Sequence, residues 1–276
     1  MTKYKLGIIG IGFVGNAILQ SLQKKNFKLE EDLFIYDKYK DGGIGNIFNM
    51  LKTNILFVAL PTPFDDIKKE YNINALYEIC KFLEDNKYEG CIVIKSTIEP
   101  ETCYKLNNDF NNLNIVHNPE FLSAKTAIED FHNQKHIVLG KSNICSEDNL
   151  NLIVSFYKKY YTDAEISLCT SLESESMKIF CNSFYAVKIQ FFTELYLLCK
   201  KNNCDFEKVK ELMLKNDWIN PMHTNIPGPD GNISYGGLCF PKDTNALNEY
   251  MKKFNSNNKV LENTILERNE MRNQIA

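Results

Sequence analysis

Short apolar runs recur along the first part of the chain, separated by stretches with helical or loop character. The runs lie at residues 6–9, 33–36, 54–60, 91–95, 114–117, 136–139 and 164–168. Continuous apolar runs of this length are typical of strands that are buried on both faces. Strands that alternate with helices predict a mostly parallel sheet covered by helices on both sides.

The pattern becomes helical near Thr170. Thr170 and Ser171 offer a helix cap, and Glu173 and Glu175 suit the first turn because acidic side chains favour helix N-termini. Residues 177–200 contain no glycine or proline, so we expect one long helix there with a broad apolar face. Shorter helices are expected at residues 206–214, 244–253 and 259–272.

A glycine motif follows the first apolar run. Gly10, Gly12 and Gly15 form a Gly-x-Gly-x-x-Gly pattern, and Asp37 ends the second apolar run. In this motif the first glycine makes a tight turn, the second lets a pyrophosphate approach the backbone, and the third packs the helix against the strand. Asp37 would bind the ribose hydroxyls and repel a 2′-phosphate. The motif therefore predicts a Rossmann-type domain that binds NAD in preference to NADP.

These patterns define the fold that we predict. It is an α/β fold with a Rossmann-type NAD-binding domain over residues 1–169 and a mostly helical domain over residues 170–276, joined by the long helix. A broad apolar helix face suits a subunit interface. We therefore expect a homodimer that forms through this helix around residues 183–198.

Polar clusters stand where three strands of the sheet are expected to end. They are Pro61-Thr62-Pro63, residues 96–100 and residues 118–122. Ligands of parallel sheets bind at the carboxyl ends of the strands. Each cluster alone is most often a plain turn, but three of them beside a nucleotide motif indicate a binding site.

A cysteine lies in a turn-like segment, residues 236–243, with the sequence GGLCFPKD. The two glycines let the backbone come close to a ligand. Lys242 stands near enough to Cys239 to favour the thiolate, which is the nucleophilic form. Asp243 could orient or deprotonate a water. Such a segment is more often a Gly-Pro turn around a buried cysteine, and the nucleotide motif is what favours a reactive thiol here.

Composition argues against several classes of protein. A net charge of −3 and a pI near 5.9 argue against a nucleic-acid or membrane-surface partner. No apolar run approaches the ~20 residues of a membrane span, and we expect no signal peptide. Nine scattered cysteines without a Cys-x-x-Cys pair suggest reduced thiols and a cytoplasmic location. The four histidines lack metal-ligand spacing, so no metal is predicted.

Together these motifs resemble those of the UDP-glucose/GDP-mannose dehydrogenase family, NAD enzymes that oxidise the C6 alcohol of a nucleotide sugar to a carboxylate. The resemblance runs through essentially the whole chain in the family's order. It is carried by the glycine motif, residues 60–63, 95–97 and 118–122, Glu175-Ser176-Met177-Lys178 with Asn182, and residues 236–243. UDP-glucose is the leading substrate on this resemblance, with GDP-mannose or an N-acetylated UDP-hexosamine as alternatives.

The resemblance implies a covalent mechanism centred on Cys239. The thiol would attack the aldehyde that the first hydride transfer produces, giving a thiohemiacetal. A second hydride transfer would give a thioester, which water then hydrolyses. Lys178 and Asn182 are four residues apart and share one side of the long helix. They would stabilise the oxyanion at the reacting carbon.

The resemblance also implies roles for the strand-end residues. Thr97 and Asp243 would hold the water used in proton transfer, and Glu120 would act as general acid and base in hydrolysis. The implied contacts with the cofactor are Gly10, Gly12, Phe13, Val14, Gly15, Asp37, Thr62 and Thr97. The implied contacts with the substrate are Glu120, Phe121, Leu122, Lys178, Asn182, Tyr235 and Gly236.

The sequence departs from the family pattern in two places. The family usually carries an acid where Ala124 stands, which removes one expected contact on the cofactor side. The family also usually continues into a third domain that helps to bind the nucleotide, whereas this sequence ends at Ala276. Either a separate chain supplies that contact or loops of the first two domains hold the substrate.

Two other functions remain open at this point. A two-electron hydroxyacid dehydrogenase shares the fold and a lysine on the long helix, but it has no use for a thiol acceptor such as Cys239. An inactive NAD-binding scaffold is the non-enzymatic alternative. The joint presence of the six implied catalytic residues argues against it, because drift would have removed some of them.

Overall fold

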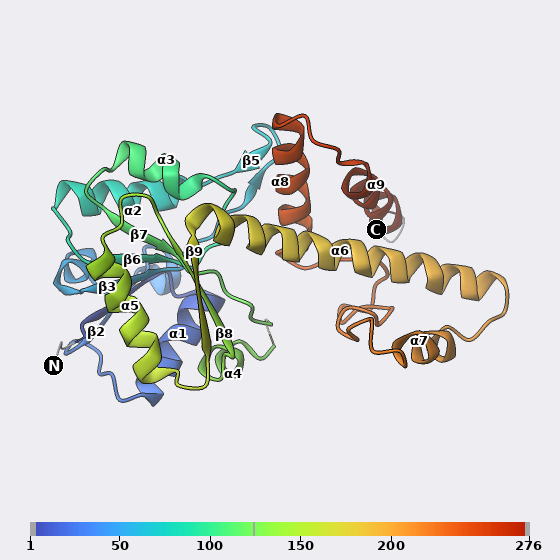
Figure 1. Cartoon of the computed structure of the whole chain (residues 1–276), viewed down its shortest axis with the longest axis horizontal. Helices are drawn as coiled ribbons and strands as arrows, with labels where there is room; N and C mark the ends of the chain where they lie inside the picture. The colour runs from blue at the N-terminus through green and yellow to red at the C-terminus, as the bar shows by residue number, and fades with distance from the viewer. Residues whose placement is uncertain (1–3, 124, 274–276) are drawn as a thin grey trace. The chain divides into compact units, whose positions relative to one another are not determined.

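The structure is a computed structural model that describes residues 4–123 and 125–273 (Figure 1). Ala124, where the family usually carries an acid, lies outside the described residues. The chain forms two compact units. The first comprises Met1–Pro63 and Asn72–Lys178, and the second comprises Phe64–Tyr71 and Ile179–Ala276. The boundary predicted between residues 169 and 170 falls where the last strand meets the long helix, and it stays a prediction.

The first unit is built on a seven-stranded sheet. Its order is β2-β1-β3-β6-β7-β8-β9, and every neighbouring pair is parallel except β7 and β8. The strands are β1 (Leu6–Ile9), β2 (Leu33–Tyr36), β3 (Ile55–Val58), β6 (Cys91–Ile94), β7 (Asn114–His117), β8 (His136–Lys141) and β9 (Glu165–Thr170). All seven apolar runs are therefore strands, and the predicted mostly parallel sheet is confirmed.

Helices cover both faces of this sheet, because successive strand residues alternate between two separate apolar cores. Leu6 and Ile8 of β1 belong to one core, and Ile9 belongs to the other. The first core contains side chains of α1 (Phe13–Lys24), α4 (Ala127–His132) and α5 (Glu147–Tyr160), and the second contains side chains of α2 (Asn74–Asp85), α3 (Thr102–Asp109) and the 3-10 helix η2 (Ile47–Lys52) (Figure 1). A further 3-10 helix, η1, spans Lys40–Gly42. This layered sheet is the predicted α/β fold.

The second unit is mostly helical. Its short hairpin of β4 (Phe64–Asp65) and β5 (Glu70–Tyr71) contacts α8 (Phe240–Lys253), although the two lie far apart in the sequence. Two more helices are α7 (Phe206–Leu214) and α9 (Lys259–Asn273), and the long helix α6 (Ser171–Lys201) begins in the first unit. In the described part of the chain, no helix is long and apolar enough to cross a membrane.

The long helix begins at the cap that the sequence predicts, and a second helix begins earlier than predicted. Helix α6 starts at Ser171 because Thr170 and Glu173 cap it reciprocally: the Glu173 carboxylate accepts from the Thr170 backbone N–H at 2.8 Å, and the Thr170 hydroxyl accepts from the Glu173 N–H at 3.3 Å. Helix α8 starts at Phe240 instead of residue 244. Pro241 stands in its first turn, where a proline costs no hydrogen bond, so Cys239 directly precedes a helix.

Candidate active site

The glycine motif of the first unit has the geometry of a dinucleotide cradle. Gly10 has a φ of +87°, and a Cβ at Gly15 would lie 1.8 Å from the Gly10 carbonyl oxygen. Both positions therefore require glycine. A Cβ at Gly12 would meet nothing within 4 Å, so the space in front of Gly12 is open. Phe13 and Val14 begin α1 directly after it. The residues present therefore fit a pyrophosphate at the N-terminus of this helix.

Asp37 stands at the end of β2 beside this turn. Its carboxylate accepts hydrogen bonds from the backbone N–H groups of Ile11 at 2.8 Å, Tyr39 at 3.0 Å and Lys40 at 2.9 Å. Burial alone would raise the pKa of Asp37, but these hydrogen bonds and the charge of Lys40 outweigh it and hold the pKa below its ordinary value. The Asp37 carboxylate is therefore an anion at neutral pH and can accept a hydrogen bond from a ribose hydroxyl.

The three polar clusters lie at the ends of neighbouring strands, as predicted, because β3, β6 and β7 are adjacent in the sheet. Side chains tie the first two clusters together. The Thr62 hydroxyl donates to the Thr97 carbonyl at 2.6 Å, and the Ser96 hydroxyl donates to the Leu60 carbonyl at 2.6 Å. These bonds hold Thr62 and Thr97 at the carboxyl edge of the sheet.

The third cluster meets the beginning of the long helix. The buried Lys178 ammonium donates to the Glu120 carbonyl at 2.5 Å and lies 4.0 Å from the Glu120 carboxylate. It also lies 5.1 Å from the centre of the exposed Phe121 ring. The Glu120 carboxylate accepts from the Leu122 N–H at 2.6 Å. The structure therefore brings together two predicted catalytic residues, Glu120 and Lys178, and two predicted substrate contacts.

A buried polar network of Lys95, Asn118 and Tyr157 supports this cluster. Lys95 is only 3% exposed, and its ammonium donates to the Asn118 side-chain oxygen at 3.0 Å, which also accepts from the Tyr157 hydroxyl at 2.5 Å. Burial lowers the pKa of Lys95 to about 7, against the opposing charge of Glu120. Lys95 and Asn118 belong to segments that carry the family resemblance, but no sequence pattern placed Tyr157 beside them.

The sequence predicts that Glu175 stabilises the first turn of its own helix, but the structure shows a different role. Its carboxylate instead accepts from the backbone N–H groups of Glu101 at 2.7 Å and Cys103 at 2.9 Å, where α3 begins. It therefore caps α3 from the side. Burial, the largest effect, raises the pKa of Glu175 to about 7 in spite of these bonds.

In the second unit, Asp243 is fully buried and surrounded by donors. Its carboxylate accepts from the Asn182 amide at 2.6 Å, the Tyr71 hydroxyl at 2.5 Å and the Lys242 ammonium at 2.5 Å. A buried carboxylate is costly without such partners. The structure thus joins the predicted residues Asn182 and Asp243. It adds Tyr71, which no local pattern could have identified because it lies 172 residues from Asp243 along the chain.

Cys239 is exposed and directly precedes α8, one turn before Asp243. Gly237 has a φ of +76°, a conformation that side chains rarely adopt. Lys242, which the sequence analysis paired with the thiol, makes its closest described contacts with the Asp243 carboxylate and the Tyr71 ring, 4.6 Å from the ring centre. The thiol is thus presented on a tight glycine turn at a helix N-terminus.

Tyr235 and Gly236 hold the loop before this turn. Tyr235 is buried, its hydroxyl lies 3.4 Å from that of Thr244, and its carbonyl accepts from Arg268 at 3.3 Å. A Cβ on Gly236 would lie 2.8 Å from the Arg272 guanidinium, so a larger residue there would displace the Arg272 side chain. Contacts of these two residues with a substrate stay a prediction.

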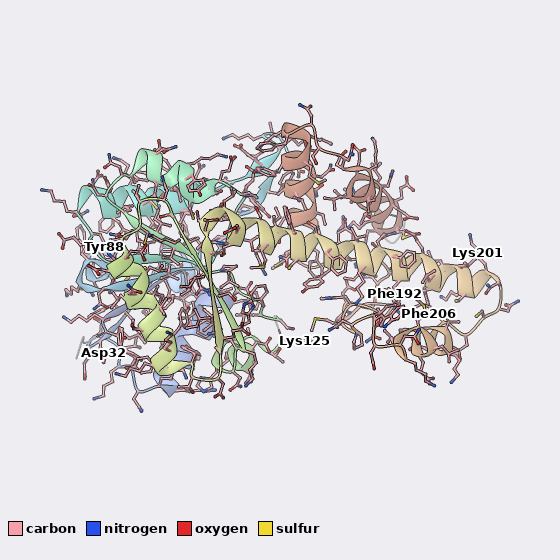
Figure 2. The ribbon with its side chains drawn as sticks, in the orientation of Figure 1. Asp32, Tyr88, Lys125, Phe192, Lys201 and Phe206 are labelled. Atoms are coloured by element: carbon pink, nitrogen blue, oxygen red, sulfur yellow. The ribbon has the colours of Figure 1, made fainter. Side chains whose placement is uncertain are left out.

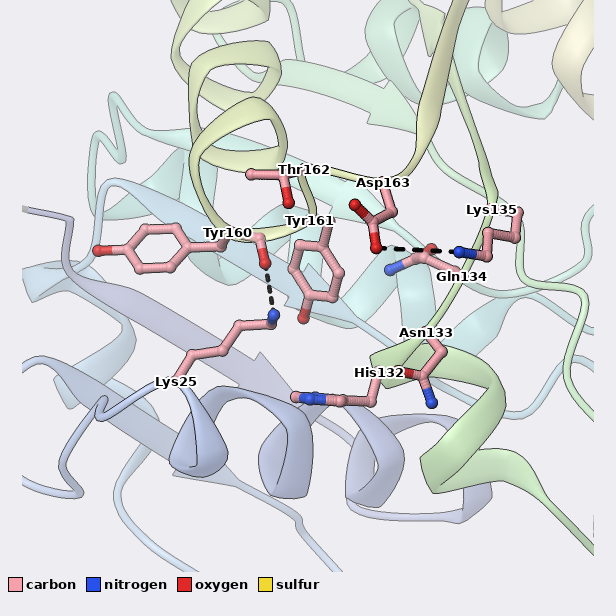
Figure 3. Close-up of a pocket in the computed structure, with 9 residues that line it drawn as sticks. All are labelled: Lys25, His132, Asn133, Gln134, Lys135, Tyr160, Tyr161, Thr162 and Asp163. Atoms are coloured by element: carbon pink, nitrogen blue, oxygen red, sulfur yellow. Dashed lines mark hydrogen bonds and ion pairs between the residues drawn. The ribbon is translucent and has the colours of Figure 1, made fainter.

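A cavity of about 210 Å³ lies elsewhere in the first unit, near the points where α1, α4 and α5 end (Figure 3). None of the predicted site residues lines it. Lys25 donates to the carbonyl of Tyr160, the last residue of α5. Because helix C-termini carry partial negative charge, this lysine is explained as a cap for the helix.

No metal site stands out among residues 4–123 and 125–273. No three histidine, cysteine, aspartate or glutamate side chains gather there in a way that could hold a metal ion. The chemistry of the two clusters is that of a thiol, carboxylates, amides and ammonium groups.

Comparisons with known proteins agree with this geometry. Residues 46–161 match the NAD binding domain of the UDP-glucose/GDP-mannose dehydrogenase family, and residues 172–270 match its central domain. These two matched domains, in this order, are those of the NAD-dependent nucleotide-sugar dehydrogenases. The two matches cover most of the chain, and the chain belongs to the UDP-glucose/GDP-mannose dehydrogenase family.

Individual relatives support this assignment. A UDP-glucose 6-dehydrogenase of Rickettsia bellii is 33% identical over 218 residues, 77% of this chain and 48% of the relative. Another, from Campylobacter jejuni, is 26% identical over 294 residues, 97% of this chain and 72% of the relative. The solved UDP-glucose dehydrogenase of Pyrobaculum islandicum shares the fold, with a TM-score of 0.82 at 21% identity over 98% of this chain and 68% of that one. The chain thus spans about half the length of the Rickettsia relative.

Proposed function

We propose that this protein oxidises the C6 alcohol of a nucleotide sugar to a carboxylate in two successive hydride transfers. NAD, when bound at the glycine turn, supplies the hydride acceptor. The observation that carries the proposal is Cys239, an exposed thiol on a glycine turn at the start of α8, one turn from a buried carboxylate. A dehydrogenase that stops at the aldehyde or ketone needs no such thiol.

The residues of the second unit suit the thiol chemistry. The aldehyde carbon would form a bond to the Cys239 sulfur, and the resulting oxyanion would need donors. The Asn182 side chain is held by Asp243 at 2.6 Å, so its orientation is fixed before the substrate arrives. Preorganised donors of this kind cost no reorganisation during the reaction. Asp243 would also hold the water that accepts the alcohol proton.

The residues of the first unit suit proton transfer and hydrolysis. Lys178 is buried against Glu120, and its ammonium would donate to the charge that develops on the reacting oxygen. Glu120 is a carboxylate beside an ammonium, and it would activate the water that cleaves the thioester. The Thr97 backbone is fixed by the hydrogen bond from the Thr62 hydroxyl, and Thr97 would orient the water that takes part in proton transfer from the alcohol.

UDP-glucose is the substrate that we propose, because the two curated relatives described above are named UDP-glucose 6-dehydrogenase. GDP-mannose and an N-acetylated UDP-hexosamine are the alternatives within the family. Formation of NADH by the purified chain with a panel of these nucleotide sugars tests the choice. UDP-glucose should give the highest kcat/KM. If no nucleotide sugar yields NADH although NAD binds, the chain is either the inactive scaffold or an enzyme that needs a separate chain to hold the nucleotide.

We also propose that two copies pair through α6. Large apolar side chains remain exposed along one stripe of this helix, at Phe180, Phe184, Phe191 and Leu198, with exposures of 51–63%. Their spacings of four and seven residues match the seam of paired helices. Sedimentation should show a dimer, and Phe184→Glu should give a monomer. A monomeric wild-type chain at micromolar concentration would contradict this part of the proposal.

A further inference from the structure

The C-terminal end of α6 brings two cysteines together. Asn203, just past the helix, has a φ of +58°, and the Cys204 N–H donates to the Cys199 carbonyl at 2.9 Å. With Asn202 as the C-cap, Cys204 is the second residue after the cap and Cys199 is the third residue before it. A hydrogen bond between these two positions is the one that closes a Schellman motif. In that ending the two residues pack their side chains against each other, usually as an apolar pair. Here both are cysteines.

The backbone geometry permits a bond between the two sulfur atoms. With standard bond lengths, a 2.9 Å hydrogen bond holds the two Cα atoms no more than about 6.8 Å apart. Disulfides span Cα separations of roughly 4.4–6.8 Å. The helix ending therefore holds the pair within disulfide range before any oxidation occurs.

The two thiols differ in their surroundings. Cys199 is buried in an apolar cluster with Phe192, Phe206 and Ile226, and Figure 2 shows the two phenylalanines between α6 and α7 near Lys201. Burial, followed by the contact with Cys204, raises the pKa of the Cys199 thiol. Cys204 is exposed. An oxidant from solution therefore reaches Cys204 first, and Cys199 is the shielded second thiol.

We propose that Cys199 and Cys204 form a thiol–disulfide modification site that reacts with a small disulfide such as oxidised glutathione. The Cys204 thiolate attacks one sulfur of the small disulfide and releases one small thiol, leaving a mixed disulfide. The Cys199 thiolate then attacks the Cys204 sulfur and releases the second small thiol. The protein loses two electrons and two protons, and the small disulfide gains them. The product ties the last turn of α6 to the residue that precedes the Asp205 cap of α7.

Peptide mapping tests the proposal directly. The full chain is incubated with oxidised glutathione under native conditions, the remaining thiols are alkylated, and the protein is digested with trypsin. Cleavage after Lys200 and Lys201 leaves the two cysteines on separate peptides that only a disulfide can join. We expect this linked pair, together with the loss of the alkylatable thiols of Cys199 and Cys204. Amide exchange in the last turn of α6 should slow at the same time.

Two variants separate the proposed steps. A Cys239→Ser background removes the other exposed thiol, whose own oxidation would add to the number of thiols lost. In this background, Cys199→Val fills the apolar site but lacks the second thiol, so glutathione should stay attached to Cys204. Cys204→Ser should keep all its remaining thiols. The proposal is overturned if Cys204 keeps its glutathione although Cys199 is present, or if the linked peptides form only after denaturation.

Discussion

The glycine turn permits a test that separates packing from cofactor binding. A Cβ added at Gly15 would lie 1.8 Å from the Gly10 carbonyl oxygen, and a backbone oxygen cannot rotate away as a side chain can. A Cβ added at Gly12 would meet nothing within 4 Å, and the φ of Gly12 is −75°, which alanine adopts. The added methyl group therefore clashes with the protein backbone in Gly15→Ala, whereas in Gly12→Ala it occupies the space proposed for the pyrophosphate.

The expected magnitudes differ accordingly. Overpacking costs 1–3 kcal/mol, and the rigid neighbour of Gly15 places Gly15→Ala near the upper end, at about 3 kcal/mol or a fall in Tm of roughly 6–12 °C. Gly12→Ala should cost under about 1 kcal/mol, because only a cap residue changes. It should still weaken NAD binding about 10- to 100-fold, the loss of one charge-assisted hydrogen bond of roughly 1.5–3 kcal/mol.

Thermal unfolding of the NAD-free protein and calorimetric titration with NAD measure the two effects. We expect a large loss of stability for Gly15→Ala, and for Gly12→Ala a loss of affinity for NAD with nearly unchanged stability. Undiminished NAD binding by Gly12→Ala would refute the assignment of the pyrophosphate to this turn. An unchanged Tm for Gly15→Ala would refute the close approach of α1 to β1.

Three further outcomes follow from single residues. NAD should bind well ahead of NADP, and Asp37→Ala should narrow the gap; equal affinities for the wild type would remove Asp37 from its role. Burial lowers the pKa of His117 from 6.5 to about 3, so its contribution to stability is complete above pH 6.5 and is lost as the pH falls towards 3. Between pH 7 and pH 5 this loss is about 2 kcal/mol, and urea titrations of His117→Gln should lack it; an identical pH slope in both proteins would contradict it. Lys178→Met should lower kcat by about 10²-fold or more through lost oxyanion stabilisation, with NAD affinity unchanged, and a loss below about tenfold would exclude this role.

The strands and the short helix α7 could be predicted from the sequence because local signals dominate there. The strands of the large sheet coincide with apolar runs, and the structure buries β1, β3 and β6 along their whole length, whereas β9 at the edge of the sheet stays partly exposed. Helix α7 is capped by the Asp205 side chain, which accepts from the N–H groups of Glu207 and Lys208. The start of α8 was placed too late, because a proline after a cysteine was interpreted as part of a turn. Proline fits a first helical turn equally well.

The contacts that shape the candidate site were harder to predict. Resemblance to a family pointed to Asp243 and Asn182, but the third partner, Tyr71, comes from a hairpin whose position depends on tertiary packing. Glu175 suited a helix start by sequence, yet its side chain reaches α3. Lys95 resembles a strand end, and only its burial shows that its charge is unusually costly. Contacts between residues far apart in the sequence produce no hydrophobic periodicity, so they cannot be predicted from the sequence pattern.

The ratio of NADH formed to sugar consumed tests the central claim most directly. Oxidation of an alcohol to a carboxylate through a thioester on Cys239 requires two hydride transfers at one carbon. Wild-type protein with a limiting amount of UDP-glucose should therefore give two NADH per sugar and no free aldehyde. Cys239→Ser should still bind NAD but fail to release the acid, because a serine ester lacks the thiolate leaving group. One NADH per sugar, with undiminished turnover by Cys239→Ser, would contradict the account and favour a two-electron dehydrogenase.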